Sequence, residues 1–251
     1  IHFSQSFFYR FFQCVKAIME VKKIIVMNYD TNQLSDVIKK IGKIKVDYWV
    51  DSGTLLGLVR EGCLLDGDND IDIGVWSEDE KKILLAFDLY FKDDYSLKKY
   101  YFKNKIFKLK FIPICAEKRK IDICLFNRYR GFAWCFQSLF FRKKNKPFYY
   151  LMAIIEHVFT AKYINNSSNL FYGKYPLLLF RRPGFWKVPL QHFENTENFN
   201  FQGIDIKTPS DTDKYLSLRY GDWRSAKSNW NFMTDDGLLI RKFPNKLLEK
   251  L

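Results

Sequence analysis

The chain has 251 residues, of which 47% are hydrophobic and 27% are charged, and this globular balance excludes a wholly disordered chain. With only 12 glycines and 7 prolines, collagen-like and linker-rich chains are excluded as well. The formal net charge of +13 at pH 7 favours an anionic partner, which the charge alone does not identify.

The N-terminal part of the chain is predicted to be helical. Apolar residues at helical spacing predict a helix over 3–27, and Thr31 or Asn32 is placed to cap a second helix that ends near Lys43. The hydrophobic period then changes. Residues 47–51 have the pattern of a short strand, which ends at a Ser-Gly turn and is followed by a short helix over 55–60.

The middle and C-terminal parts mix strands and helices. A strand is predicted over 71–76, and Ser77–Glu80 has the pattern of a capping box that opens a helix to about Phe91. Further strands are predicted over 95–102, 105–112 and 120–126, and further helices over 149–163 and 211–219. Because no linker is visible, we expect one α+β domain over 47–251, with a mixed sheet flanked by helices, and a helical segment over 1–46 packed on it.

The cysteines and histidines do not have the spacing of a zinc site. The five cysteines form no C-x-x-C pair, and the three histidines lie far apart in the chain. We therefore expect buried, reduced thiols. No window of about 18 residues is free of charge, so no transmembrane helix is predicted.

The segment from Asp66 to Asp72 places four carboxylates at alternate positions. In a strand, Asp70 and Asp72 would share one face, with Ile71 and Ile73 on the other. Such carboxylates repel one another unless a cation neutralises them, and Mg²⁺ or Mn²⁺ with oxygen ligands is the natural solution. Solvated surface acids are the alternative, but they do not explain the interleaved apolar residues. A calcium loop of EF-hand type is excluded, because neither register of the motif is satisfied.

A strand, a Ser-Gly turn, a short helix and a later D-x-D strand form the layout of the nucleotidyltransferase fold of DNA polymerase β type. In that layout the turn and the helix N-terminus bind nucleotide phosphates, and the aspartates hold a divalent cation. Here residues Ser52, Gly53 and Thr54 form the turn. Asp122 is the only acid in the apolar strand over 120–126, and we expect it to supply a third carboxylate. A lone exposed strand acid is the alternative for Asp122.

Three segments resemble the LicD/fukutin family. They are W-V-D-S-G-T-L-L-G-L-V-R over 49–60, D-N-D-I-D-I-G over 68–74, and Y-L-x-x-x-Y-G-x-W over 215–223, which follows Pro209. The resemblance covers roughly 47–76, 121–123 and 204–230. One departure is Gly67, where the family has a bulky residue, together with an extra acid at Asp66, and this leaves the donor open.

The resemblance implies a metal-dependent transferase with a nucleotidyltransferase-fold catalytic domain. Such enzymes move phosphocholine, ribitol phosphate or a similar group from a CDP-activated donor to a glycan or a cell-surface glycopolymer, as in lipopolysaccharide or teichoic acid biosynthesis. Ser52, Gly53, Thr54 and Asp68 would bind the substrate. The cation, Mg²⁺ or Mn²⁺, would lie on Asp68, Asp70, Asp72 and Asp122, and the catalytic set would be Asp70, Asp72, Asp122 and Arg60. Asp122 is expected to accept the hydroxyl proton.

Two further functions stay open: a true nucleotidyltransferase acting on RNA or a small molecule, and a non-catalytic protein that binds glycan or nucleic acid. Residues 98–146 carry fifteen Lys or Arg and two Asp or Glu, whereas residues 47–94 hold thirteen acids and four bases. We expect this basic segment to contact a glycan or, peripherally, a membrane surface, rather than nucleic acid. An idle basic face is the alternative. We expect a cytoplasmic location, although a chain that begins with Ile1 leaves open a removed upstream anchor and a Golgi-lumen location.

Overall fold

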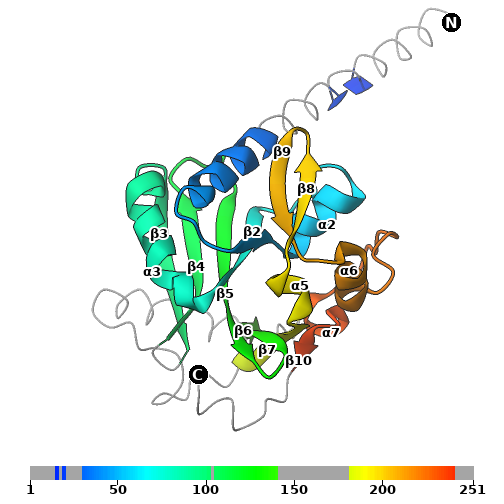
Figure 1. The fold of residues 1–251 in the computed structure, drawn as a ribbon. Helices are drawn as coiled ribbons and strands as arrows, with labels where there is room; N and C mark the ends of the chain where they lie inside the picture. The colour runs from blue at the N-terminus through cyan, green and yellow to red at the C-terminus, as the bar shows by residue number, and fades with distance from the viewer. Residues whose placement is uncertain (1–14, 17–18, 21–29, 103–104, 141–180, 241–251) are drawn as a thin grey trace, which may run out of the picture.

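The computed structural model describes residues 15–16, 19–20, 30–102, 105–140 and 181–240 (Figure 1). Of the helix predicted over 3–27, only residues 15, 16, 19 and 20 are described, and they are helical. The helix predicted over 149–163 lies outside the described residues.

Strands dominate the described elements. In chain order these are a helix over 30–42, β1 (Tyr48–Val50), α2 (Ser52–Arg60), β2 (Asp70–Trp76), the 3-10 turn η1 (Ser77–Asp79), α3 (Glu80–Ala86), the π-helical turn η2 (Phe87–Phe91), β3 (Tyr95–Phe102), β4 (Lys105–Pro113), β5 (Lys120–Tyr129), β6 (Phe132–Phe140), β7 (Arg181–Pro189), α5 (Gln191–Glu194), β8 (Glu197–Phe201), β9 (Ile204–Thr208), α6 (Thr212–Tyr220), α7 (Phe232–Asp235) and β10 (Leu239–Ile240).

One eight-stranded sheet forms the centre of the described structure. Its main path runs β1-β2-β5-β6-β7-β10, and β4 pairs with β5 and with β3. The β2–β5 pair is parallel, and the other pairs described in this sheet are antiparallel. Strands β8 and β9 form a separate hairpin. The predicted combination of helices with a mixed, largely antiparallel sheet is therefore confirmed.

The first face of the sheet carries most of the aliphatic core. Because side chains alternate along a strand, Phe111 of β4 points to the face opposite Lys108 and Lys110. Its ring lies 4.9 Å from Phe87 and 5.1 Å from Phe91, which follow α3. The helix over 30–42 packs beside them, with Lys40 Nζ 5.3 Å from the centre of the Phe91 ring. Helices thus cover this face (Figure 1).

The second face carries the aspartates of β2 and an aromatic layer. Trp49 of β1 lies across Gly74, where a Cβ atom would come within 2.2 Å of the indole. The Trp49 ring stacks on Phe193 of α5 at 4.1 Å, and Phe193 in turn contacts Tyr215 of α6 at 5.7 Å. The sheet therefore has helices on both faces, and α5 and α6 are held beside the strand that carries Asp70 and Asp72.

Several local predictions are wrong. Residue 30 is already helical, so Thr31 does not cap that helix, and its hydroxyl donates to Gln202 Oε1 instead. Ser77 does not cap α3 either, because its hydroxyl donates to Asn127 Oδ1 at 2.7 Å. Helix α2 begins at Ser52, three residues earlier than predicted. The sequence patterns also missed β6, β7, β10 and the β8–β9 hairpin.

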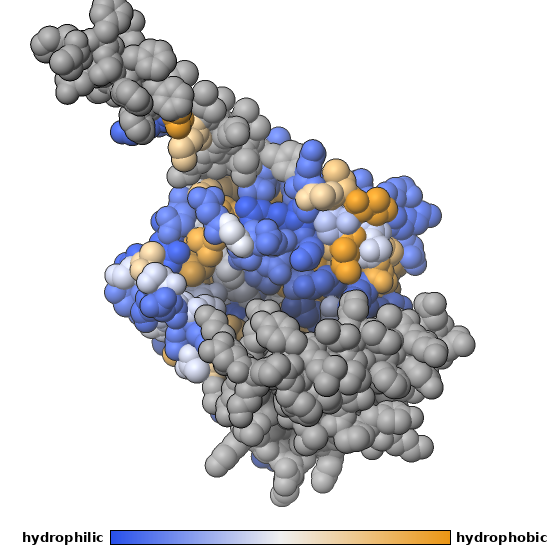
Figure 2. All heavy atoms as spheres, turned by 180° about the vertical axis from the view of Figure 1, so that it is seen from behind, coloured by the Kyte–Doolittle hydropathy of each residue, from blue (hydrophilic) through white to orange (hydrophobic). Residues whose placement is uncertain are grey.

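The remaining expectations concern thiols and membranes. Cys124 and Cys135 are buried as expected, whereas Cys63 is half-buried and Cys115 is exposed. Among the described helices, none combines the length and apolar character needed to cross a membrane. The surface seen from behind is mainly hydrophilic where it is described, with small apolar patches (Figure 2).

Candidate functional site

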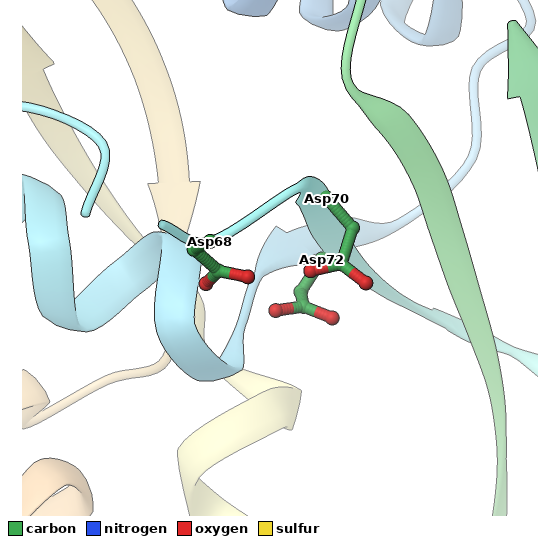
Figure 3. A group of neighbouring side chains, drawn as sticks. All are labelled: Asp68, Asp70 and Asp72. Atoms are coloured by element: carbon green, nitrogen blue, oxygen red, sulfur yellow. The ribbon is translucent and has the colours of Figure 1, made fainter. Parts of the chain in front are cut away.

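Three aspartates converge at the start of β2. Asp68 comes from the loop before the strand, and Asp70 and Asp72 come from the strand itself (Figure 3). One carboxylate oxygen from each lies within 4.8 Å of the others, and all three residues are half-buried. The alternation of a strand places Asp70 and Asp72 on one face, as the sequence predicts.

Burial and mutual repulsion perturb the acids of this group. Burial raises the pKa of Asp68 to about 7, and a hydrogen bond and the charge of Asp70 act in the same direction. Burial also raises the pKa of Asp72, again with the charge of Asp70 as the next cause. Three converging oxygen donors, with the pKa raised at Asp68 and Asp72, fit a hard divalent cation, because such a cation removes the repulsion that favours protonation.

Helix α2 begins directly beside this acid group. Asp51 caps the helix, since its side chain accepts a hydrogen bond from the Ser52 amide at 2.6 Å. Ser52 has a φ of 52°, a left-handed conformation that turns the chain sharply from β1 into α2. The first backbone bond of the helix runs from the Leu55 amide to the Asp51 carbonyl at 3.0 Å, so the amides of Gly53 and Thr54 precede it and have no partner within the helix. They are suited to phosphate oxygens.

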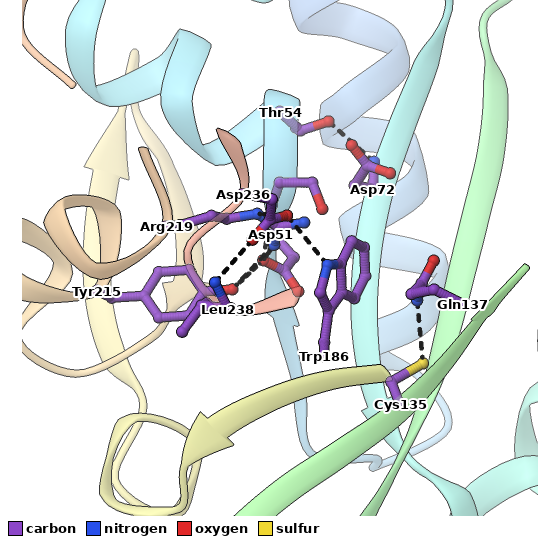
Figure 4. Close-up of polar contacts among 11 residues, drawn as sticks. Asp51, Thr54, Asp72, Cys135, Gln137, Trp186, Tyr215, Arg219, Asp236 and Leu238 are labelled. Carbon is purple, nitrogen blue, oxygen red and sulfur yellow. Dashed lines mark hydrogen bonds and ion pairs between the residues drawn. The ribbon is translucent and has the colours of Figure 1, made fainter. Parts of the chain in front are cut away.

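Gly53 and Thr54 bring the start of α2 into contact with the acid group. A Cβ atom on Gly53 would lie 2.2 Å from Asp68 Oδ2 and 3.8 Å from Asp72 Oδ2, so the carboxylates lie directly against the helix start. The Thr54 hydroxyl accepts a hydrogen bond from the Asp72 amide at 2.8 Å (Figure 4). Thr54 therefore ties α2 to β2, which is a positioning role in addition to the predicted phosphate contact.

A buried polar network supports the cap of α2 from α6. The Tyr215 hydroxyl and Arg219 Nη1 both donate to Asp51 Oδ1, at 2.5 and 2.9 Å (Figure 4). Arg219 Nε also lies 3.2 Å from Asp236 Oδ2, which accepts a further bond from Trp186 Nε1 at 3.0 Å. Tyr215 and Arg219 belong to the C-terminal motif of the sequence, so the network gives that motif a physical role: it holds Asp51 and thereby the turn at the start of α2.

Arg119 holds the loop that carries Asp68. Its guanidinium pairs with both carboxylate oxygens of Asp30, at 2.9 and 2.5 Å. The remaining nitrogen donates to the backbone carbonyls of Leu65, at 3.3 Å, and Asp68. Gln33, one turn after Asp30, accepts from the Arg119 amide at 3.0 Å and donates to its carbonyl at 2.8 Å. The helix over 30–42 is thus linked to the acid group.

Sequence patterns missed Asp51, Arg119, Asp30 and Gln33 as site residues. For Asp51 a signal existed, because an aspartate directly before a helix start is a preferred N-cap. For Arg119 there was none, since its partners lie 51 to 89 residues away in the chain.

Asp122 lies next to Asp72 but is engaged by lysines. The two aspartates are register partners on the parallel strands β2 and β5. Asp122 is 2% exposed, and its oxygens lie 2.5 Å from Lys108 Nζ and 3.1 Å from Lys110 Nζ. The metal-type group among the described residues comprises Asp68, Asp70 and Asp72 without Asp122. The roles of Asp122 as cation ligand and proton acceptor stay predictions.

Arg60 lies at the far end of α2 from the acid group. Its Nε pairs with Glu61 Oε1 at 2.6 Å, and its Nη1 donates to the Trp223 carbonyl at 3.3 Å. The structure therefore brings the arginine of the first motif to the tryptophan of the last motif, rather than to the aspartates. Its assistance in catalysis stays a prediction.

The chain is similar in sequence to uncharacterized proteins of two Rickettsia species. The chain is 34% identical over 95 residues to an uncharacterized protein of Rickettsia typhi, which corresponds to 38% of this chain and 28% of that protein. It is 43% identical over 47 residues to an uncharacterized protein of Rickettsia prowazekii, or 19% of this chain and 18% of that protein. The chain therefore covers less than a third of either curated relative.

A lincosamide antibiotic adenylyltransferase, LnuA, in its lincomycin-bound crystal structure aligns with 74% of this chain and 83% of its own, with a TM-score of 0.40 and 12% identity. The model of the LicD/FKTN/FKRP nucleotidyltransferase domain matches residues 45–211, which is more than half of the chain. The motifs, the site and this match together show that the chain belongs to the LicD/FKTN/FKRP nucleotidyltransferase-domain family.

Proposed function

We propose that the protein transfers a phosphorylated alcohol, such as phosphocholine or ribitol phosphate, from a CDP-activated donor to a glycan or glycopolymer, with Mg²⁺ or Mn²⁺ as cofactor. One observation carries the proposal: the carboxylates of Asp68 and Asp72 lie directly against Gly53 at the start of α2. A cation held by the acids and a phosphate held by the helix amides would then be neighbours, which suits a pyrophosphate donor.

The residues of the chain have separate tasks in this proposal. The amides of Gly53 and Thr54 bind the donor phosphates, and Ser52 shapes the turn that presents them. Asp68, Asp70 and Asp72 hold the cation, which when bound neutralises the charge that develops on the phosphate oxygens. The Asp51 network keeps the helix start in place. Positioning and electrostatics supply the rate, as in phosphoryl transfer generally.

A nucleotide screen tests the donor. CDP-choline, CDP-ribitol, UDP-glucose, ADP-ribose and GDP-mannose would each be added with Mg²⁺ while thermal unfolding is followed. A ligand at about 100 times its Kd stabilises the folded state by about 2.7 kcal/mol, which is a shift of several degrees in Tm. We expect the CDP donors to give the largest shift. Equal shifts for all five nucleotides would contradict the choice of a cytidine donor.

Product analysis separates this reaction from true nucleotidyl transfer. A transferase acting on CDP-alcohols releases CMP and no pyrophosphate, whereas a nucleotidyltransferase releases pyrophosphate from a nucleoside triphosphate. The reaction would be followed by chromatography of the nucleotides and by a pyrophosphate assay. Pyrophosphate release from any triphosphate, without CMP release from CDP donors, would replace the proposal.

The cation site is tested by a matched pair of variants. Asp72→Asn removes a charge from the acid group, whereas Asp66→Asn removes one from an exposed acid just outside it. We expect Asp72→Asn to lose activity by about a hundredfold or more and to lose Mg²⁺-induced stabilisation, while the metal-free protein unfolds at the same or a higher temperature because repulsion is relieved. Asp66→Asn should behave as wild type. Wild-type turnover in Asp72→Asn would exclude the cation site.

A further inference from the structure

The basic residues of β4 and β3 continue the row of aspartates across the sheet. Asp72 is the register partner of Asp122, Asp122 is the partner of Lys110, and Lys110 is the partner of Lys98. Side chains of register partners point to the same face, so these four residues form one row over β2, β5, β4 and β3. The ion pair of Lys110 with Asp122, at 3.1 Å, confirms that their side chains meet on that face.

A second row runs parallel to the first on the same face. In it Cys124 is the partner of Lys108, and Lys108 is the partner of Tyr100. Lys108 Nζ reaches Asp122 at 2.5 Å, and Lys98 Nζ lies 5.3 Å from the centre of the Tyr100 ring. The strand face beside the acid group is therefore basic, with an aromatic ring beneath its outermost lysine.

Beyond β2, where the acid group lies, the charges on this face do not balance. Lys108 and Lys110 share the carboxylate of Asp122, and Lys98 lies one strand further out as the register partner of Lys110. The side chains of Lys108 and Lys110 are 22% exposed, and Lys98 is exposed. The surplus of positive charge is thus accessible to an anionic ligand, and Asp122 fixes two of the three ammonium groups in place.

The spacing of the strands sets the reach of such a ligand. Neighbouring strands lie about 4.8 Å apart, so Lys110 is about 10 Å and Lys98 about 14 Å from Asp72 along the row. An anionic group bound at these lysines and a hydroxyl bound beside the acid group can belong to one substrate molecule only if that molecule is extended. A linear chain with repeated phosphodiester groups fits cations that recur at strand spacing.

We propose that Lys98, Lys110 and Lys108 form an acceptor subsite, which binds a phosphate of a phosphodiester-bearing glycopolymer about 10 to 14 Å from Asp72 of the acid group. The subsite deepens the proposed function and rests on it for the identity of the acceptor. The binding of the anion itself needs only the lysine row. Asp122 acts here as a positioning residue that orients Lys108 and Lys110.

The test measures binding of a soluble tetramer of glycerol phosphate to the full chain by isothermal titration calorimetry, with CMP and Mg²⁺ present and absent. Lys98→Gln and Lys110→Gln each remove one charge from the row. Lys99→Gln is the matched control, because Lys99 is an exposed neighbour whose side chain points to the other face of β3. We expect Lys98→Gln and Lys110→Gln to weaken binding by about threefold to tenfold each, and Lys99→Gln by less than about twofold.

Each contrary outcome has a distinct meaning. Equal losses in all three variants would overturn the subsite, because binding would then follow net charge alone. No loss in Lys98→Gln and Lys110→Gln would overturn it as well. Vesicles with an anionic phospholipid are the third arm: if they bind through Lys98 while the tetramer does not bind, the face is a membrane surface and the acceptor subsite is wrong.

The two proposals fail separately. If the CDP donors give no Mg²⁺-dependent stabilisation but the tetramer still binds through Lys98 and Lys110, the proposed function fails and the anion subsite stands. If the donors bind and release CMP, but Lys98→Gln and Lys110→Gln bind the tetramer as well as wild type does, the proposed function stands and the subsite fails.

Discussion

At Gly53 the chain has a hydrogen atom where any other residue would have a Cβ, and the Asp68 carboxylate occupies that space. The nearest oxygen of Asp68 would lie 2.2 Å from such a Cβ, and Asp72 Oδ2 would lie 3.8 Å from it. The contact brings the start of α2 and the acid group together without a side chain between them. A phosphate bound at the helix start can therefore reach a cation bound by the acids.

We expect Gly53→Ala to impair the cation site more than the fold. The new methyl group meets the end of a carboxylate side chain, which can swing away, so the free energy of unfolding should fall by less than about 2 kcal/mol. The displaced Asp68 carboxylate should lower the apparent Mg²⁺ affinity, read from Mg²⁺-induced thermal stabilisation, by about tenfold. Gly42→Ala is the control, since nothing lies within 4 Å of a Cβ there. Unchanged Mg²⁺ affinity in Gly53→Ala would show that Asp68 is not a ligand.

At the scale of elements, α2 and α6 are joined by charges that are fully inside the protein. Asp51 and Arg219 are each 2% exposed, and Asp236 is 5% exposed. Arg219 thus bridges two buried carboxylates, and its guanidinium also lies 4.1 Å from the centre of the Trp186 ring. Burying three charges is costly unless all are paired, so the arrangement depends on every member.

We expect Arg219→Met to destabilise the protein by about 3–5 kcal/mol, because it leaves Asp51 and Asp236 buried without a cation. Tyr215→Phe removes one hydrogen bond to Asp51 and should cost about 1.5–3 kcal/mol with the fold retained. Arg224→Met is the surface control: Arg224 pairs with exposed Asp213, and the loss should stay below about 1 kcal/mol. Urea unfolding measures all three. If Tyr215→Phe unfolds at the wild-type midpoint, the Tyr215 hydrogen bond does not stabilise Asp51.

The helix over 30–42 and the loop that carries Asp68 form a second pair of joined elements. Arg119 supplies the link, because a planar guanidinium can bind the Asp30 carboxylate and two loop carbonyls at once. A lysine at position 119 would keep the positive charge but could not make these several hydrogen bonds at once.

We therefore expect Arg119→Lys to lower the apparent Mg²⁺ affinity by about threefold to tenfold and the stability by about 1–3 kcal/mol. Asp36→Asn is the matched control on the same helix, because the Asp36 side chain that pairs with Lys40 is 53% exposed and this i,i+4 pair should contribute about 0.5 kcal/mol. Thermal unfolding with and without Mg²⁺ measures both quantities. Equal Mg²⁺ responses in wild type and Arg119→Lys would mean that the loop needs no support from the helix.

Local patterns and long-range contacts explain which parts of the site the sequence predicts. Asp70 and Asp72 follow from the period of a strand, and the Ser-Gly turn follows from a strand that gives way to a helix. Both signals are contained in a few neighbouring residues. Arg119 and Arg219 act on partners 17 to 168 residues away, and no local period reveals which carboxylate an arginine will meet. Strand β6 was missed because its apolar run does not alternate with polar residues, and β7 because Pro183 and Gly184 interrupt it.

At the scale of the whole molecule, charge is divided between two neighbouring regions. Thirteen acids and four bases occupy 47–94, and fifteen bases and two acids occupy 98–146. The structure brings the two regions together on one sheet, since β2 pairs with β5 and β5 with β4. Part of the basic segment, residues 141–146, lies outside the described residues, so the predicted role of its Arg and Lys stays a prediction.

Salt should therefore act differently on the two substrates. The screening length is about 10 Å at 0.1 M salt and about 3 Å at 1 M, so it falls below the spacing of the exposed lysines but not below the contacts of a half-buried cation site. Raising NaCl from about 0.05 M to about 0.5 M should weaken binding of the glycerol phosphate tetramer by about tenfold or more, while stabilisation by a CDP donor with Mg²⁺ should change by less than about threefold. Calorimetry and thermal unfolding of the same protein sample measure the two effects.

The Lys98→Gln variant should show a shallower salt dependence for the tetramer than wild type, whereas Lys99→Gln should match wild type. A donor that is lost with salt as steeply as the tetramer would place the nucleotide on the lysine face instead of at the start of α2.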